Sequence, residues 1–125
     1  MAPATVLVVE DNEKNMKLFR DVLAATGFRT LEATTGEQAV ELASERGPDL
    51  VLMDIQLPDI DGIEALGRLR ADARTASLPV LALTAQAMEG DRERFLAAGF
   101  DGYLSKPVNV ADFVATVRRY CEGSP

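Results

Sequence analysis

The 125-residue chain contains no histidine and a single cysteine, Cys121. Without histidine, this chain alone cannot form a Ser-His-Asp or Cys-His catalytic site, or a zinc site built on imidazole. One cysteine cannot close an intrachain disulfide. Its position in a C-terminal amphipathic segment indicates a small, half-buried packing residue rather than a reactive thiol.

Long apolar runs are also missing, because none approaches the roughly 18 residues needed to span a bilayer. Residues 1–5, MAPAT, lack the charged segment that begins a secretory signal peptide. We therefore expect one cytoplasmic domain over residues 1–125. The 20 acidic and 13 basic residues give a net charge of −7. This charge repels phosphates and anionic lipids, so neither nucleic acid nor a membrane is an expected partner.

Short apolar runs alternate with longer amphipathic segments along the chain. Runs rich in valine and leucine are typical of strands buried on both faces of a parallel sheet. They cover residues 5–10, 29–33, 50–53, 79–83 and 102–104. The five β/α repeats predict an α/β fold, in which a doubly wound parallel sheet of five strands carries five helices on its two faces.

The segments between the runs have the spacing of amphipathic helices. In the first segment, Met16, Phe19 and Leu23 recur every three or four residues. A similar stripe in the last segment comprises Val110, Phe113, Val114 and Val117. Residues 88–98 form the weakest predicted helix, because they include Gly90 and a dense cluster of charges. Glycines in the left-handed conformation are expected to close three helices, at Gly27, Gly47 and Gly99.

Polar residues follow the predicted strands at their carboxyl ends. Glu10 and Asp11 follow the first run, and Asp54 closes the third. Thr84 and Lys106 follow the last two. In an open α/β sheet the ligand crevice lies outside the carboxyl ends of the strands. We therefore expect these residues to converge, although they are far apart in the sequence.

Three carboxylates in one crevice predict a bound cation. Two like charges about 4 Å apart repel by roughly 4 kcal/mol at an effective dielectric constant near 20. Mg²⁺ relieves this repulsion and usually takes one or two carboxylates, which leaves another free to react. A carboxylate can attack phosphorus to form an aspartyl phosphate. Lys106 and the metal would supply positive charge around the phosphoryl group, and the Thr84 hydroxyl could contact one of its oxygens.

The segments around these residues resemble the response-regulator receiver domain. The matching motifs, in the order and spacing of that family, are VVEDN at 8–12, LMDIQLP at 52–58, DG at 61–62, LTA at 83–85 and SKP at 105–107. The resemblance extends from about residue 6 to residue 121. Residues 10–19 and 54–58 are similar to the single-domain DivK-type regulators of bacterial cell-cycle control, and also to receiver modules of hybrid histidine kinases.

This resemblance implies a flavodoxin-like strand order of 2-1-3-4-5 and a set of site residues. Asp54 would be the phosphoacceptor. Asp11, Glu10 (largely through water) and the backbone carbonyl of Gln56 would hold Mg²⁺ beside it. Lys106 would pair with the phosphoryl group and precede a cis peptide bond.

The resemblance also implies how the domain would signal and with what. Thr84 and Tyr103 would form a switch that responds to phosphorylation. The partner would be a histidine kinase or a histidine phosphotransfer protein, docked on Met16 of the first helix and on the loop after Lys106. That loop comprises Pro107 and Val108. The domain would be a phosphoacceptor rather than an enzyme, and Gln56 and Gln86 would influence the phosphoryl lifetime.

Simpler roles stay open for each of these residues taken singly. Asp54 could cap a helix after its strand, and Thr84 could cap the next one. Lys106 could be a surface lysine, and Tyr103 could be a packing residue. Gly62 is expected to serve the backbone geometry of a turn.

Two other functional classes fit the sequence less well than the receiver. A phosphatase with an aspartyl-phosphate intermediate typically has a second aspartate two residues after the first, where this chain has Gln56. A nucleotide- or flavin-binding module would need a glycine-rich turn after the first strand. Residues 10–14 are acidic and lack glycine, so they would repel a phosphate.

Overall fold

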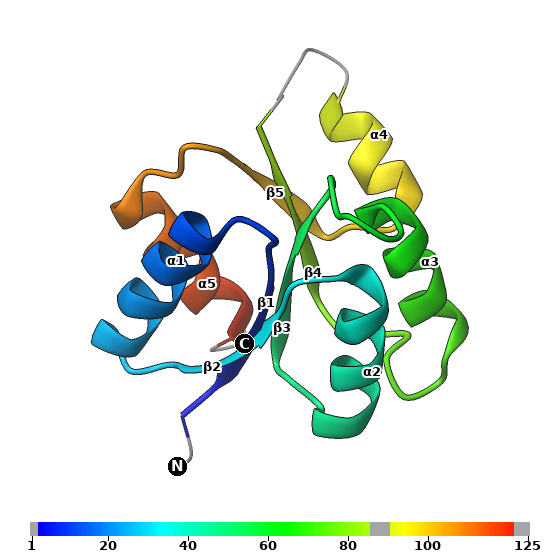
Figure 1. Ribbon diagram of the computed structural model, residues 1–125, viewed down its shortest axis with the longest axis horizontal. Coiled ribbons are helices and arrows are strands. Elements are labelled where there is room, and N and C mark those ends of the chain that lie inside the picture. Colours follow the sequence, from blue (N-terminus) through cyan, green and yellow to red (C-terminus); the bar gives the residue numbers. More distant parts are fainter. Residues whose placement is uncertain (1–2, 86–90, 122–125) are drawn as a thin grey trace.

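The computed structural model describes residues 3–85 and 91–121, in which strands and helices alternate along the chain (Figure 1). The strands are β1 (Thr5–Val9), β2 (Arg29–Ala33), β3 (Leu50–Asp54), β4 (Val80–Thr84) and β5 (Gly102–Ser105). The helices are α1 (Glu13–Ala25), α2 (Gly36–Arg46), α3 (Gly62–Ala71), α4 (Asp91–Ala98) and α5 (Val110–Cys121). Each predicted strand matches an observed one to within one residue at either end.

The strands form one parallel sheet in the order β2-β1-β3-β4-β5. Helices α1 and α5 lie on one face of this sheet and α2, α3 and α4 on the other (Figure 1). The predicted doubly wound α/β fold, with its strand order of 2-1-3-4-5, is therefore confirmed. This topology brings the carboxyl ends of β1, β3, β4 and β5 to the same edge of the sheet.

The core consists of two apolar layers, one on each face of the sheet. Successive residues of a strand point to opposite faces. In β3, Leu50 and Leu52 therefore face α1 and α5, whereas Val51 and Met53 face α2, α3 and α4. All five residues of β3 are buried, which explains why its sequence is a continuous apolar run rather than an alternating one.

Side-chain caps and glycines set the helix ends. The side chains of three residues accept a hydrogen bond from a backbone N–H in the first turn of the following helix: Asn12, Thr35 and Asp61. The glycines expected to close helices do adopt positive φ angles: Gly27, Gly47 and Gly99. The caps begin α1, α2 and α3 just after the chain leaves the carboxyl ends of β1, β2 and β3.

The structure corrects the prediction for two apolar side chains. Met16 was expected to be an exposed docking residue, but only 5% of it is exposed, because it packs in the layer between α1 and the sheet. Val110, assigned to the buried stripe of the last helix, is 48% exposed at the first position of α5. The predicted start of the fourth helix, with Met88 and Gly90, lies outside the described residues.

No helix within residues 3–85 and 91–121 is long and apolar enough to cross a membrane.

Candidate functional site

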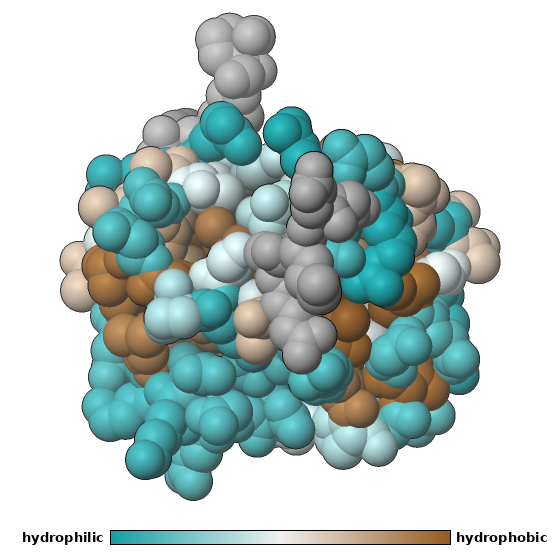
Figure 2. All heavy atoms as spheres, turned by 90° about the horizontal axis from the view of Figure 1, so that it is seen from above, coloured by the Kyte–Doolittle hydropathy of each residue, from teal (hydrophilic) through white to brown (hydrophobic). Residues whose placement is uncertain are grey.

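A cleft of about 740 Å³ lies at the carboxyl ends of the strands. Its lining includes Glu10, Asp54, Thr84 and Lys106, which come from four different strand ends. Figure 2 looks onto this end of the molecule, where hydrophilic residues are more prominent than hydrophobic ones. The predicted convergence of these residues is therefore present in the fold.

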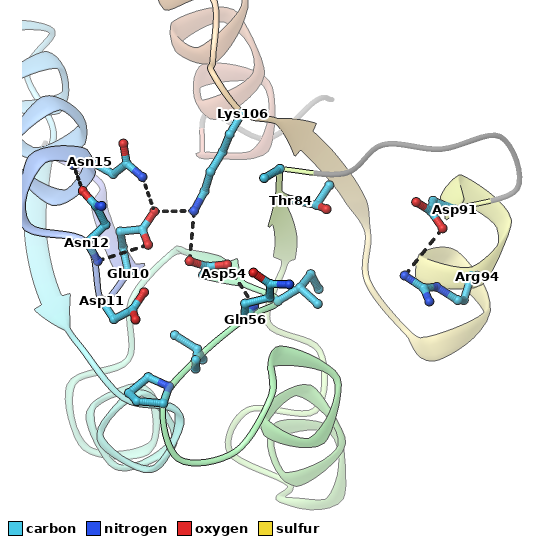
Figure 3. Close-up of a pocket in the computed structure, with 14 residues that line it drawn as sticks. Glu10, Asp11, Asn12, Asn15, Asp54, Gln56, Thr84, Asp91, Arg94 and Lys106 are labelled. Atoms are coloured by element: carbon cyan, nitrogen blue, oxygen red, sulfur yellow. Dashed lines mark hydrogen bonds and ion pairs between the residues drawn. The ribbon is translucent and has the colours of Figure 1, made fainter.

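Lys106 joins two buried carboxylates at the centre of the cleft (Figure 3). Its Nζ lies 2.5 Å from Oε1 of Glu10 and 2.9 Å from Oδ2 of Asp54. Glu10 is 1% exposed and Asp54 is 6% exposed. Burying an ionised group costs several kcal/mol unless it is paired, so this shared lysine is what makes two buried acids tolerable. Lys106 is thus part of the site rather than a surface lysine.

The surroundings of Glu10 favour its protonated form. Burial, followed by the neighbouring carboxyl of Asp54, raises the pKa of Glu10 to about 7, although Lys106 acts in the opposite direction. For Lys106, burial lowers the pKa, but the bonds to Glu10 and Asp54 outweigh it, and the pKa lies above its ordinary value. The site therefore carries more negative charge than one lysine can neutralise.

Two asparagines at the start of α1 also contact Glu10. The side-chain amide of Asn15 donates to Oε1 at 3.2 Å, and the backbone N–H of Asn12 donates to Oε2 at 3.4 Å. The Asn12 side chain meanwhile accepts a hydrogen bond from the backbone N–H of Asn15 at 3.0 Å. Asn15 was not among the predicted site residues. Its place in the first turn of a helix that follows Glu10 could have indicated that it lies near the site.

Asp54 is held by the loop that follows β3. Its Oδ1 accepts a hydrogen bond from the backbone N–H of Gln56 at 3.0 Å. The helix after this loop is capped by Asp61, whose Oδ1 accepts from the N–H of Glu64 at 2.8 Å. The alternative role of Asp54 as a helix cap is therefore wrong. Its two oxygens instead accept hydrogen bonds from Gln56 N–H and Lys106 Nζ, so the carboxylate lies in the cleft.

The role expected for Gly62 is corrected by its contacts. Its φ angle is not positive, so no special turn conformation is needed. A Cβ atom at this position would overlap the backbone carbonyl oxygen of Asp54 and lie 3.0 Å from the Cα atom of Ile55. Gly62 therefore serves the close approach of α3 to the strand end that carries Asp54.

Thr84 and Tyr103 lie on the neighbouring strands β4 and β5, and Thr84 also lines the cleft. Thr84 is buried at the end of β4, and its carbonyl accepts a hydrogen bond from the backbone N–H of Lys106 at 2.8 Å. Tyr103 is half-buried on β5, with its ring centroid 6.1 Å from that of Phe95 on α4. The peptide bond between Lys106 and Pro107 is cis, as the resemblance implied. Gln86, which was expected to influence the phosphoryl lifetime, lies outside the described residues.

Three carboxylates form a group that fits a hard divalent cation. Glu10, Asp11 and Asp54 each offer one carboxylate oxygen, and these oxygens all lie within 4.8 Å of one another. Asp11 is exposed, whereas the other two are buried. Oxygen donors of this kind suit Mg²⁺, which keeps several of its waters and takes few carboxylates. The exposed side of the group leaves room for such waters.

A second contact missed by the sequence reasoning fixes the loop between β3 and α3. The carboxylate of Asp59 accepts hydrogen bonds from the backbone N–H groups of Gly36 and Glu37, at 2.8 and 2.9 Å. Desolvation opposes ionisation here, but these backbone bonds dominate and lower the pKa of Asp59 to about 2. Asp59 thereby ties the loop that contains Gln56 to the N-terminus of α2.

Comparison with known proteins identifies the family. Residues 6–118 match the family model described as the response regulator receiver domain. The chain is 48% identical over 118 residues to the polar-differentiation response regulator DivK of Brucella anthropi, covering 94% of this chain and 96% of that protein. It is 47% identical over 116 residues to DivK of Brucella ovis, covering 93% of this chain and 94% of that protein.

A solved structure shares both the fold and part of the sequence. The receiver domain of a sensor histidine kinase from Pseudomonas aeruginosa PAO1 has a TM-score of 0.89 and 37% identity, covering 98% of this chain and all of that one (100%). That crystal structure contains a magnesium ion coordinated in the active-site cleft. Together with the matched family model, these similarities show that the chain belongs to the response-regulator receiver family of two-component signalling, and that it is similar to DivK.

Proposed function

We propose that Asp54 accepts a phosphoryl group from a phosphohistidine of a partner protein, and that the added charge is the signal. The observation that carries this proposal is the shared lysine. Lys106 contacts both Glu10 and Asp54, and Asp11 completes a group of three converging carboxylates. A buried acid held beside one lysine and a cation-binding group is suited to accept a phosphoryl group.

The transfer is a displacement at phosphorus. An oxygen of Asp54 forms the new P–O bond while the P–N bond to the donor imidazole breaks, and the bonding electron pair goes to the imidazole nitrogen. Lys106 already donates to Asp54 Oδ2 at 2.9 Å, so a small shift brings its charge onto a phosphoryl oxygen. The chain contains no histidine, which fits a donor that belongs to another protein.

The residues at the cleft fit a magnesium ion. Asp11, Glu10 (largely through water), Asp54 and the backbone carbonyl of Gln56 would hold it. When bound, the metal supplies positive charge that neutralises the phosphoryl oxygens. The magnesium in the active-site cleft of the related Pseudomonas receiver supports this assignment. The convergence of three carboxylate oxygens within 4.8 Å of one another also supports it.

The response would be a change in a two-state element next to the site. A phosphoryl group adds about −1.5 to −2 charges at neutral pH. Thr84, whose hydroxyl we assign to a phosphoryl oxygen, and Tyr103 are the proposed switch residues. Within Asp91–Ala98 only Phe95 is buried, and it is the residue that Tyr103 contacts. A helix held by so little buried surface has low local stability, which suits a moving element.

The partner would be a histidine kinase or a histidine phosphotransfer protein that docks on α1 and on the loop after Lys106. Leu18 replaces the buried Met16 as the apolar contact on α1, because it is 41% exposed. Pro107 is exposed and Val108 is half-buried. The net charge of −7 gives no support for binding nucleic acid or an anionic membrane.

We assign the chain the role of a phosphoacceptor rather than that of an enzyme that turns over small phosphoesters. The position two residues after Asp54, where such phosphatases carry an acid, is Gln56. An amide cannot protonate a leaving group. Gln56 can instead orient or exclude the water that would attack the aspartyl phosphate.

The test is uptake of radiolabelled phosphoryl groups from acetyl phosphate, with Mg²⁺ and with EDTA. We expect acid-stable, base-labile label on the wild-type chain only when Mg²⁺ is present, and none on Asp54→Ala. Asp112→Ala removes an exposed acid on α5 and should be labelled like the wild type. Equal labelling of Asp54→Ala and wild type would overturn the proposal.

A further inference from the structure

We propose that Asn15 is a positioning residue, which fixes Glu10 at the metal site while Lys106 is free to move to the phosphoryl group. This inference rests on the proposed function. Asn15 is not one of the site residues predicted from the sequence, which include the carboxylates, Lys106 and Thr84.

The geometry places two donors on one oxygen of Glu10. Oε1 lies 2.5 Å from Lys106 Nζ and accepts a hydrogen bond from Asn15 Nδ2 at 3.2 Å. Figure 3 shows Glu10 between the two, with Lys106 on the side of Asp54 and Asn15 on the side of α1. The other oxygen, Oε2, has a longer bond of 3.4 Å from the backbone N–H of Asn12. Glu10 is therefore held from α1 as well as from the lysine.

The start of α1 aims the Asn15 side chain at Glu10. Asn12 caps the helix by accepting from the backbone N–H of Asn15 at 3.0 Å. Helical side chains point back toward the N-terminal turn, and in this helix that direction leads to the end of β1, where Glu10 lies. Asn15 is half-buried, so its amide has little water to bond in place of the carboxylate.

The two donors behave differently when Asp54 gains a phosphoryl group. The ammonium group of Lys106 is shared between Glu10 and Asp54, and the added negative charge on Asp54 would attract it away from Glu10. Asn15 is neutral and belongs to a different element, so nothing draws it away. Its hydrogen bond would keep a buried carboxylate from losing both partners at Oε1 and from turning out of the site.

The alternative is that Asn15 only contributes to the stability of α1. The two roles predict different Mg²⁺ affinities for Asn15→Ala. Alanine is a better helix former than asparagine, so a residue that serves only the helix could be replaced without loss of metal affinity. A residue that positions Glu10 would lose Mg²⁺ affinity while the fold remained stable.

The control is Asn109→Ala, which removes the same side chain from the start of another helix. Asn109 Oδ1 accepts a hydrogen bond from the backbone N–H of Asp112 at 3.1 Å. Loss of such a cap destabilises a protein, but within the described residues the hydrogen bonds of Asn109 go to the first turn of α5 and not to Glu10 or Asp54. Asn109→Ala should therefore lower the urea midpoint of unfolding and leave the Kd for Mg²⁺ unchanged.

The experiment measures Mg²⁺ binding by isothermal titration calorimetry, without any phosphodonor, together with urea unfolding. We expect Asn15→Ala to raise the Kd for Mg²⁺ about tenfold, the low end for groups that orient a metal ligand, with an unchanged unfolding midpoint. In a Glu10→Gln background, Asn15→Ala should have no further effect on the Kd. An unchanged Kd in Asn15→Ala would overturn the inference, and so would an equal loss with and without Glu10.

Labelling by acetyl phosphate separates this inference from the proposed function. If the wild-type chain takes up no label, the proposed function fails, while the Mg²⁺ titrations still decide whether Asn15 positions Glu10. If the wild type is labelled and Asn15→Ala binds Mg²⁺ equally well, only the role of Asn15 fails.

Discussion

The first residue of helix α3, Gly62, packs directly against the backbone of Asp54. A Cβ atom at position 62 would overlap the carbonyl oxygen of Asp54. The backbone N–H of Gly62 also donates to the carbonyl oxygen of Ile55 at 2.9 Å. The helix and the strand end that carries the proposed phosphoacceptor are therefore one packed unit, and the position of Asp54 depends on the absence of a side chain at residue 62.

Replacing Gly62 by alanine should disturb both the fold and the site. The added methyl group meets backbone atoms that cannot move aside, so we expect the free energy of unfolding to fall by about 1–3 kcal/mol. Label uptake from acetyl phosphate should fall with it. The measurements are urea unfolding and initial labelling rates.

Gly67 provides the matched control in the same helix. A Cβ atom at this exposed position meets nothing within 4 Å. Gly67→Ala should therefore raise the free energy of unfolding by about 0.5–1 kcal/mol and leave labelling unchanged. A Gly62→Ala variant that is as stable and as active as Gly67→Ala would show that the close approach is unimportant.

The proposed docking surface predicts different effects for two exposed leucines. Leu18 on α1 is 41% exposed and Leu96 on α4 is 43% exposed. Leu18→Glu should slow phosphoryl transfer from a phosphohistidine protein about tenfold or more, because it adds a charge at an apolar contact. Labelling by acetyl phosphate, which needs no docking, should stay as in the wild type.

Leu96→Glu is the control for a charge placed at an equally exposed leucine outside that surface. It should leave both reactions unchanged. If the two variants are slowed alike with the protein donor, α1 is not the surface that donors recognise. Met16→Glu is not a suitable probe, because Met16 is buried and a charge at this position would destabilise the fold.

The sequence was sufficient to predict the fold and the convergence of the central residues. Apolar runs mark the strands, and the carboxyl ends of parallel strands share one edge of the sheet, so Glu10, Asp54 and Lys106 were expected to converge there. The burial of Met16 and Val110 was harder to predict. The spacing of apolar residues identifies one face of a helix, but it does not define which residues at the margin of that face are buried. Met16 was therefore expected to be exposed and Val110 to be buried, and both expectations were wrong.

Contacts between a side chain and a distant backbone could not be predicted. Asp59 binds the start of α2, 23 residues earlier in the chain at Gly36. Nothing in the local sequence distinguishes it from any exposed aspartate in a loop. The role of Gly62 could not be predicted either, because a close backbone approach and a turn both favour glycine. Only the contact with the backbone of Asp54 distinguishes the two roles.

The carboxylate of Asp59 should stabilise the fold in a pH-dependent way. Its pKa is lowered to about 2, so the contribution is complete above the unfolded value of about 3.9 and is lost as the pH falls through about 2. Asp59→Ala should therefore be less stable than the wild type near neutral pH, and the difference should shrink in acid. Urea unfolding over a series of pH values measures this difference.

Glu41→Ala, which removes an exposed acid from α2, controls for the change in net charge. If its stability profile with pH matches that of Asp59→Ala, the bonds to Gly36 and Glu37 contribute nothing specific.

Glu10 should have the opposite pH dependence in the metal-free protein. Its pKa rises from 4.5 to about 7 on folding, so the folded state holds the proton more tightly. The free energy of unfolding should therefore decrease as the pH rises from about 4.5 to about 7, by at most about 1.4 kcal/mol per pH unit, and level off above. Urea unfolding in EDTA measures this slope.

Glu10→Gln cannot ionise and should lack this decrease, and Glu13→Gln controls for loss of an exposed acid in α1. Saturating Mg²⁺ favours the ionised carboxylates and should flatten the wild-type profile. A wild type and a Glu10→Gln variant with parallel profiles in EDTA would contradict the raised pKa.

The most direct test of the central claim is to locate the phosphoryl group after transfer from a phosphohistidine protein in Mg²⁺. The wild-type chain is treated with borohydride, which reduces an acyl phosphate and so marks its residue, and the peptides are sequenced by mass spectrometry. We expect the mark on Asp54 alone, with Glu10 and Asp11 unmarked and no transfer to Asp54→Ala. Modification of another residue, or undiminished transfer to Asp54→Ala, would contradict the role assigned to Asp54.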